Sequence, residues 1–368
     1  MNNTNTYLYS EEIKKFFDKG EIKNEYKLEL ENCPVCNNKK VDIIFKHYNF
    51  YYKRCKKCSF VFANPRLNDR GSDIWYNSNF YNAAVETEYF QVKNGNRFLA
   101  SLTLEFFEIA LTILKKLSLT KSSRILDIGC GGGAFLNYLK EMGGFLNLAG
   151  IDLNEKAVLF ARKFRGLNVE RINANSLSTN EKYDLVISME SIEHANNINM
   201  FMNILKEFMT KNSYILITTP YNDKKATLLG GIWGDHYMAP NHINFFNLKS
   251  ISLLLAKYRL EIIDYQIIRG NLGIGLIKNR LLNKRDWATH YPPISVEHGV
   301  TIPKSSNNHI DYVKYISSDA KKTNLQKSNN GEMVSPFYST ARKVYRLLSE
   351  HINLKCKTHM MIVAKEAN

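Results

Sequence analysis

The sequence predicts an α/β fold in which helices cover a mostly parallel sheet, preceded by a small cysteine-containing module. Two observations predict it. From residue 124 to residue 220, apolar strand-like segments alternate with helix-like segments, as in chains that build parallel sheets through helical crossovers. Before this region, four cysteines form two CxxC pairs between residues 33 and 58, a spacing typical of a metal-stapled module.

Seven segments have the length and apolar content of strands, so we expect a seven-stranded sheet. In chain order they are RILDIG (124–129), LAGIDL (148–153), NVERI (168–172), YDLVISM (183–189), YILITTP (214–220), LEIIDYQII (260–268) and CKTHMMIVAKE (356–366). Apolar residues at helical spacing lie between them, at 134–142, 155–164, 200–209 and 248–258, and before them at 97–118. The alternation predicts that helices cover both faces of the sheet.

The sequence divides into five parts. The last two predicted strands are separated by a long, polar and basic stretch, longer than an ordinary connection and therefore expected to have a role of its own. We interpret it as an insert that covers the substrate. The predicted parts are a head (1–65), a helical linker (66–120), the main α/β domain (121–272), the insert (273–353) and the final strand (354–368).

Composition excludes several classes of protein. At 368 residues and 44% hydrophobic content, the chain can bury a large core. Its apolar runs are too short to cross a bilayer and its polar N-terminus does not look like a signal peptide, so we expect a cytoplasmic protein. The net charge of +15 is concentrated in residues 269–355, which hold 14 Lys and Arg against 6 Asp and Glu. Such an excess suits an anionic partner or a solvated surface.

A glycine loop follows the first predicted strand of the main domain. Gly129, Gly131 and Gly133 stand at alternate positions, so the backbone can turn tightly and approach a ligand. Asp127 lies at the end of the strand before the loop, and Asp152 ends the next strand, where an acid can bind ribose hydroxyls. On these residues alone, a nicotinamide dinucleotide remains a rival ligand.

The pattern DxGxGxG at 127–133 resembles the first motif of the class I S-adenosylmethionine-dependent methyltransferases, and the similarity extends over about 121–270 to the UbiG-like group. The resemblance implies a Rossmann-like fold and S-adenosylmethionine as cofactor. It implies that Asp127 contacts the amino-acid part of the cofactor, where the pyrophosphate of a dinucleotide would be repelled, and that Asp152 binds the ribose. The resemblance also implies that Asn175 and Ser176 line the adenine. The full set of expected cofactor-binding residues is Asp127, Gly129, Cys130, Gly131, Gly133, Asp152, Leu153, Asn175, Ser176 and Glu190.

The two cysteine pairs predict a metal site. Cys33 and Cys36, with Cys55 and Cys58, can supply four thiolates to a tetrahedral zinc, which would fill the coordination sphere and make the zinc structural. An FeS4 centre uses similar cysteine spacing and remains an alternative to zinc. The stretch CPVC…YKRCKKCSFVFANPR resembles the zinc-binding head that precedes the methyltransferase domain in bacterial enzymes of sugar-nucleotide and surface-polysaccharide pathways.

Methyl transfer to a hydroxyl needs a base beside the cofactor, and histidine has a suitable pKa. His194 follows the fourth predicted strand, and His236 and His242 follow the fifth. The segment NHINFFNLKSISLLL resembles the region of sugar methyltransferases in which a histidine lies near the acceptor, so His242 is the favoured base. The alternative is that His242 only braces its loop. Glu190 and His194 are further catalytic candidates, because MESIEH (189–194) resembles the family stretch after strand four.

Three functions follow from these features. The favoured one is methyl transfer to a small molecule, with a nucleotide-linked or surface-glycan sugar as acceptor. The second is an RNA methyltransferase whose zinc head and basic surface hold nucleic acid. It is disfavoured because the stretch after strand four is SMESIEH and the basic insert lacks dense aromatic interleaving. The third is a zinc protein that keeps the fold as a binding module without activity.

Overall fold

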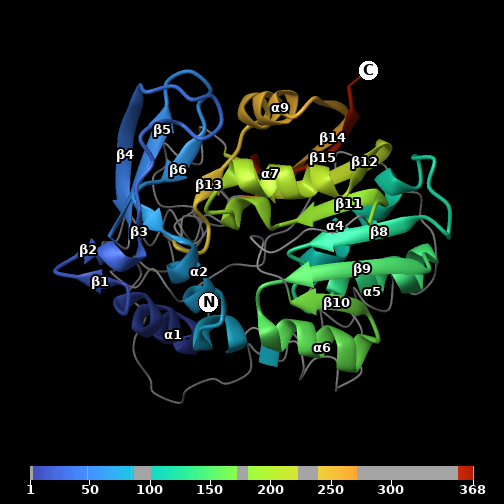
Figure 1. Cartoon of the computed structure of the whole chain (residues 1–368), viewed down its shortest axis with the longest axis horizontal. Coiled ribbons are helices and arrows are strands. Elements are labelled where there is room, and N and C mark those ends of the chain that lie inside the picture. Colours follow the sequence, from blue (N-terminus) through green and yellow to red (C-terminus); the bar gives the residue numbers. More distant parts are fainter. Residues whose placement is uncertain are drawn as a thin grey trace, which may run out of the picture.

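The computed structural model describes residues 3–47, 49–83, 85–86, 101–171, 181–222, 239–271 and 355–367. Two sheets dominate them, one of seven strands and one of four (Figure 1). The small sheet, built mainly by the N-terminal part of the chain, lies beside the large one. The predicted adenine-lining residues Asn175 and Ser176, the candidate base His236 and the insert 273–353 lie outside the described residues.

The large sheet confirms the predicted fold class. In spatial order its strands are β10 (Asn168–Arg171), β9 (Asn147–Asp152), β8 (Arg124–Ile128), β11 (Tyr183–Met189), β12 (Met209–Pro220), β15 (Lys355–Glu366) and β14 (Leu260–Asn271). The first five run parallel to one another, whereas β15 runs antiparallel to both β12 and β14. The carboxyl ends of β8, β9, β11 and β12 therefore meet at one edge, where α/β sheets bind their ligands.

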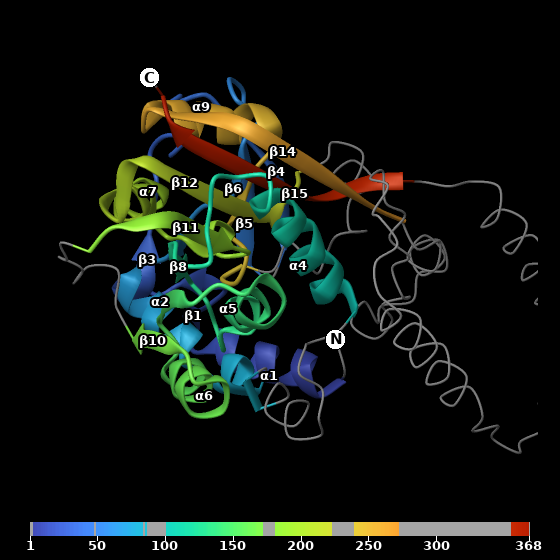
Figure 2. The same cartoon turned by 90° about the vertical axis from the view of Figure 1, so that its right-hand side faces the viewer.

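Helices cover both faces of this sheet (Figures 1 and 2). They are α4 (Ser101–Leu114), α5 (Ala134–Tyr138), η2 (Leu139–Gly143), α6 (Glu155–Arg165), η4 (Ile192–His194), α7 (Ile198–Glu207) and α9 (Leu248–Lys257). One apolar cluster joins α4 and α5 to one face, and another joins α7 and α9 to the opposite face. Side chains of Asn154, Asn197 and Asn247 accept the first amide hydrogen bonds of α6, α7 and α9, so an asparagine fixes the start of each helix.

The N-terminal part forms the smaller layer. Its elements are α1 (Asn3–Lys14), β1 (Phe17–Asp18), β2 (Glu21–Ile22), η1 (Asn24–Tyr26), β3 (Lys27–Leu28), β4 (Val41–His47), β5 (Phe50–Cys55), β6 (Val61–Ala63), β7 (Arg66–Leu67) and α2 (Asp69–Tyr76). The four-stranded antiparallel sheet has the order β13-β6-β5-β4. Its outer strand β13 (Asn244–Phe245) comes from the main domain, directly after the candidate base His242. The two parts of the protein thus share a sheet.

Arg66 connects the N-terminal part to the main domain through hydrogen bonds. Its side chain is fully buried, and its guanidinium donates hydrogen bonds to the Ala63 and Asn196 carbonyls and to Asn244 Oδ1 at 2.9, 3.2 and 3.0 Å. Asn244 in turn donates to the Ala195 carbonyl at 2.7 Å. The segment after His242 is therefore held between the head and the loop that follows β11.

In the part of the chain that the structure describes, no helix combines the length and apolar character needed to span a bilayer.

Candidate active site

The glycine loop leaves β8 with three left-handed residues: Gly129, Gly131 and Gly133 have φ angles of +79°, +54° and +76°. A Cβ at Gly129 would lie 2.6 Å from Ser191 Cβ, and one at Gly133 would lie 2.5 Å from Leu167 Cδ1, so packing as well as backbone conformation requires glycine there. A Cβ at Gly131 would meet nothing within 4 Å. Gly131 therefore borders open space, where a ligand can approach the backbone.

Two predicted acids lie beside this loop. Asp127 is 2% exposed, and its Oδ1 has no hydrogen-bond partner among the described residues. Burial, with the charge of Asp152 as a second cause, raises the pKa of Asp127 to about 8. Asp152 accepts hydrogen bonds from the Gly131 amide at 2.7 Å and the Asn154 amide at 2.8 Å, while burial raises its pKa. A cationic ligand would relieve the cost of two carboxyls buried together.

Two more carboxyls stand at the end of β11. Burial raises the pKa of Glu190 to about 7. Burial, followed by the charge of Glu190, raises the pKa of Glu193 well above its ordinary value. Glu193 is fully buried, and neither of its carboxylate oxygens has a hydrogen-bond partner in the described parts of the chain. This edge of the sheet thus holds four buried or half-buried carboxyls, which suits a ligand that carries positive charge.

The structure brings His194, His242 and Glu193 together. One nitrogen of each imidazole and one oxygen of Glu193 lie within 4.8 Å of one another, and the two rings are 4.9 Å apart between centroids. This spacing of donor atoms could also accommodate a cation. Glu193 lies in the same MESIEH stretch as the candidates Glu190 and His194, and in the structure its side chain faces the two histidines.

His194 is held in one tautomer. Its Nδ1 lies 2.7 Å from the carbonyl oxygen of Asn241, and because a carbonyl can only accept, Nδ1 carries the proton. Nε2 is therefore the basic nitrogen, 3.9 Å from Glu193 Oε1. Burial lowers the pKa of His194 to about 4. The ring is consequently neutral at physiological pH and a weak base.

Two tyrosines from the N-terminal part close over this cluster. Tyr76 in α2 makes an edge contact with the ring of His194 at 6.0 Å, and Tyr81 donates a hydrogen bond to Asn241 Oδ1. Burial raises the pKa of both phenols, and the charges of Glu193 and Asp152 add to the effect. Both tyrosines are therefore close to Asp152, at the end of β9, and to Glu193. Aromatic residues are plentiful in the sequence, and no local pattern distinguishes Tyr76 and Tyr81 from core aromatics.

The cysteine pairs meet as predicted. The Sγ atoms of Cys33 and Cys58 are 3.7 Å apart and those of Cys36 and Cys55 are 3.5 Å apart, with all four within 4.8 Å of one another. Four thiolates at 2.3 Å from a tetrahedral zinc would be about 3.8 Å apart, so the cluster has nearly the dimensions of a ZnS4 site.

The local backbone of the two cysteine pairs is alike. In each pair, the residue four positions after the first cysteine has a left-handed conformation: φ is +56° at Asn37 and +60° at Ser59. Each donates its amide to the carbonyl of that first cysteine, at 2.9 Å in both cases. The Cys33 and Cys58 thiols share a hydrogen bond, which lowers the pKa of Cys33 and raises the pKa of Cys58, so the two thiols share a proton when no metal is bound.

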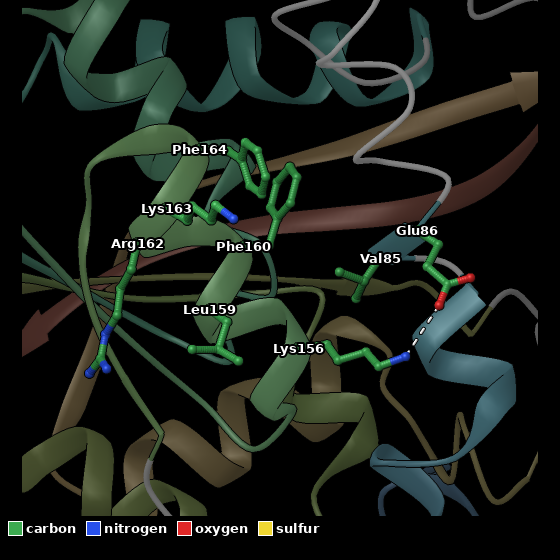
Figure 3. Close-up of a pocket in the computed structure, with 8 residues that line it drawn as sticks. All are labelled: Val85, Glu86, Lys156, Leu159, Phe160, Arg162, Lys163 and Phe164. Atoms are coloured by element: carbon green, nitrogen blue, oxygen red, sulfur yellow. Dashed lines mark hydrogen bonds and ion pairs between the residues drawn. The ribbon is translucent and has the colours of Figure 1, made fainter.

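A surface cavity of about 580 Å³ lies along the outer side of α6 (Figure 3). Its walls are Leu159, Phe160 and Phe164, with an ion pair between Lys156 and Glu86 at 3.2 Å across it. None of the predicted site residues lines this cavity, so we assign the chemistry to the carboxyl edge of the sheet.

Comparisons with known proteins identify the family of this chain. A family model described as a methyltransferase domain matches residues 94–265. The ubiquinone biosynthesis O-methyltransferase of Rickettsia canadensis is 30% identical over 149 residues, which are 38% of this chain and 62% of that protein. The Rickettsia bellii (strain OSU 85-389) protein of the same name is 30% identical over 193 residues, 49% of this chain and 75% of that protein. The chain thus spans less than two thirds of the first of these relatives.

Among solved structures, a SAM-dependent methyltransferase from Archaeoglobus fulgidus is similar with 19% identity and a TM-score of 0.39, over 70% of this chain and 94% of that one. The match to most of the Rickettsia bellii protein and to the domain model settles the family. The chain belongs to the S-adenosylmethionine-dependent methyltransferases.

Proposed function

We propose that this chain transfers the methyl group of S-adenosylmethionine to a hydroxyl of a small-molecule acceptor. The observation that carries the proposal is the juxtaposition of two sites at one edge of the sheet. The glycine loop with Asp127 and Asp152 adjoins the cluster of Glu193, His194 and His242. When bound, the cofactor supplies an electrophilic methyl group on a positively charged sulfur.

The residues of the loop fit the cofactor. Asp127 offers a buried oxygen without a partner, suited to the cofactor's ammonium group, and this interaction would favour the ionised carboxylate. Asp152 ends β9, where an acid can accept hydrogen bonds from ribose hydroxyls. Gly131 leaves room for the ligand to approach the backbone. Cys130 follows β8 and Leu153 follows β9, so both lie beside these residues. Asn175 and Ser176 remain the proposed adenine-lining residues.

We assign the base to His242 and a positioning role to His194. The low pKa of about 4 makes His194 a poor proton acceptor near neutral pH. His242 stands beside it, on the segment that Arg66 and β13 hold in place. A positive charge on His242 would favour ionisation of the neighbouring Glu193 carboxyl, and the resulting carboxylate would stabilise the transferred proton. Glu190, at the end of β11, completes the cofactor side of the site.

The cysteine cluster is proposed to hold a structural zinc. Its four thiolates would leave no position for water or substrate. The carbonyl of Ser59, which follows Cys58, accepts a hydrogen bond from Asn247 at 3.0 Å. Asn247 also starts α9, so the metal would stabilise the approach to the active site as well as the head.

Two acceptor classes are proposed. The head resembles those of sugar-nucleotide and polysaccharide enzymes, which favours a nucleotide-linked or glycan sugar. The relatives named ubiquinone biosynthesis O-methyltransferases favour a phenolic hydroxyl instead. Offering the purified protein either nucleotide sugars or catechols, with methyl-deuterated cofactor, distinguishes them by mass spectrometry. A labelled methyl product from one pool identifies the class, and none from either pool contradicts the proposed small-molecule activity.

The assignment of the base has its own test. His242→Ala should lower kcat by at least about 100-fold while the Kd for S-adenosylhomocysteine stays unchanged, because general-base catalysis contributes about 10²–10⁴-fold. The Kd is measured by titration calorimetry on the zinc-loaded protein. Retained turnover would refute the base role, and failure of the unmodified chain to bind the cofactor would refute the methyltransferase proposal itself.

A further inference from the structure

A histidine in β15, the final strand along the chain, lies at the candidate active site. His359 lies in β15 and pairs with Pro220 at the carboxyl end of β12, so it stands at the ligand-binding edge. Its Nε2 is 3.5 Å from Oε2 of Glu190, and its ring makes an edge contact with Phe106 of α4 at 4.7 Å between centroids. No motif in the sequence connects His359 with Glu190.

Glu190 is held in an uncommon backbone conformation. Its φ angle is +49°, in the left-handed region that residues with a side chain rarely adopt. Its amide donates to both the carbonyl and the hydroxyl of Thr218, at 3.1 and 3.0 Å. Strain of this kind persists where the surrounding contacts fix the residue, commonly at functional sites.

The turn that carries Glu190 is also fixed to the glycine loop. The next residue, Ser191, donates a hydrogen bond to the Ile128 carbonyl at the end of β8, at 2.8 Å. Gly129 packs so closely on Ser191 that a Cβ would overlap it. Glu190 is therefore positioned against the loop proposed to bind the cofactor, with its side chain about one-third exposed.

We propose that His359 orients the Glu190 carboxylate toward the sulfur of the cofactor, and that this pair makes the site prefer the cationic substrate form over its neutral-sulfur product. The inference rests on the proposed function. Methyl transfer removes the sulfonium charge, so S-adenosylhomocysteine loses an attraction that S-adenosylmethionine has. A carboxylate close to the sulfur, in a site partly withdrawn from water, distinguishes the two by this charge alone. His359 would contribute through its Nε2, which lies 3.5 Å from one carboxylate oxygen of Glu190, by fixing the direction of the other oxygen.

This arrangement would aid turnover. Apart from the transferred methyl group and this charge, the product has the same chemical groups as the substrate, so without the charge interaction the two would bind with similar affinity. Weaker binding after the charge is lost favours exchange of product for fresh cofactor. His359 is in this view a positioning residue, and Glu190 is the group that faces the ligand.

The test compares the ratio of two dissociation constants, that of S-adenosylhomocysteine over that of S-adenosylmethionine. Glu190→Gln keeps the shape and removes the charge. His359→Gln keeps an N–H donor, whereas His359→Leu removes it. Glu181→Gln is the matched control, because Glu181 is an exposed carboxylate paired with Arg124, at the opposite edge of the sheet. Titration calorimetry on the full-length, zinc-loaded chain measures both ligands for each variant.

We expect the ratio to fall about ten-fold in Glu190→Gln, equivalent to the loss of one charge interaction of ordinary strength. His359→Leu should lower the ratio by a similar factor, while His359→Gln and Glu181→Gln should keep it. An equal weakening of both ligands in Glu190→Gln would overturn the charge role. An unchanged ratio in His359→Leu, combined with a reduced ratio in Glu190→Gln, would overturn the role of His359. If the leucine variant fails to fold, a reduced ratio in His359→Gln, which keeps the N–H donor, would overturn it instead. If the unmodified protein bound neither ligand, the proposed function would fail instead.

Discussion

Replacing Asp127 by asparagine should stabilise the folded chain at neutral pH and at the same time abolish cofactor binding. The side chain is buried, and burial with the charge of Asp152 raises its pKa from 3.8 to about 8. Asparagine has the same shape and can still accept the hydrogen bond from the Met189 backbone. It does not have to take up a proton on folding.

The direction and magnitude of this change in stability follow from the linkage between proton binding and folding. Below pH 3.8 the carboxyl is protonated in both states and adds nothing to the pH dependence. Between pH 3.8 and about 8 the folded state binds the proton and the unfolded state does not, so stability falls as pH rises. At pH 7 the difference of about three pKa units amounts to about 4 kcal/mol, and at pH 5 to about 1.5 kcal/mol. These values are upper bounds for the increase in the free energy of unfolding of Asp127→Asn.

Urea unfolding followed by circular dichroism at pH 5, 7 and 8.5 measures the effect. The free energy of unfolding of Asp127→Asn should exceed that of the unmodified protein by an amount that grows with pH. Asp42→Asn, which changes an exposed aspartate paired with Lys56, should alter stability by less than about 0.5 kcal/mol at each pH. A difference that stayed constant with pH, or a less stable variant at pH 7, would refute the reasoning.

Three further predictions concern the glycine loop, the head and the histidine cluster. Gly133→Ala should destabilise the chain by at least about 1 kcal/mol more than Gly166→Ala in thermal unfolding, because both glycines have positive φ but only at Gly133 would a Cβ clash, with Leu167; equal losses would contradict the packing argument. Cys36→Ser should remove one of the four thiols proposed to bind zinc, abolish stoichiometric zinc in elemental analysis and lower the Tm, whereas full zinc retention would exclude a four-thiolate site. Glu193→Gln should lower kcat more than it changes the KM for the cofactor, and a change confined to that KM would place Glu193 with the cofactor instead.

Much of the fold could be predicted because its signals are local. The strands of the large sheet are short apolar runs bounded by polar turns, and the helices between them have regular apolar spacing. Asp127, Asp152 and Gly129 could be proposed from the sequence because each lies at or near the end of a predicted strand, and Gly131 and Gly133 because they follow in the same loop. The pairing of the cysteines also depends on short spacing, and the structure brings all four together.

What could not be predicted depends on contacts between distant segments. β13 has two residues, Asn244 and Phe245, too few for any periodicity, and becomes a strand because β6 lies beside it. The burial of Glu193 among histidines requires that same segment to fold back onto η4, as the hydrogen bond from the Ile243 amide to the Glu193 carbonyl shows. His359 reaches Glu190 because β15 inserts beside β12, which no local pattern indicates.

The position of β15 also determines when this sheet can be completed during synthesis. β14 forms no pairing with β12 and joins the sheet through β15, which is translated long after both. While residues 355–366 remain in the ribosome, an apolar edge of β12 and the whole of β14 lack their partner strand. A nascent chain at that stage would expose strand edges that favour association with other chains. A premature stop before residue 355 would remove an interior strand and not a peripheral one, so we expect such products to aggregate.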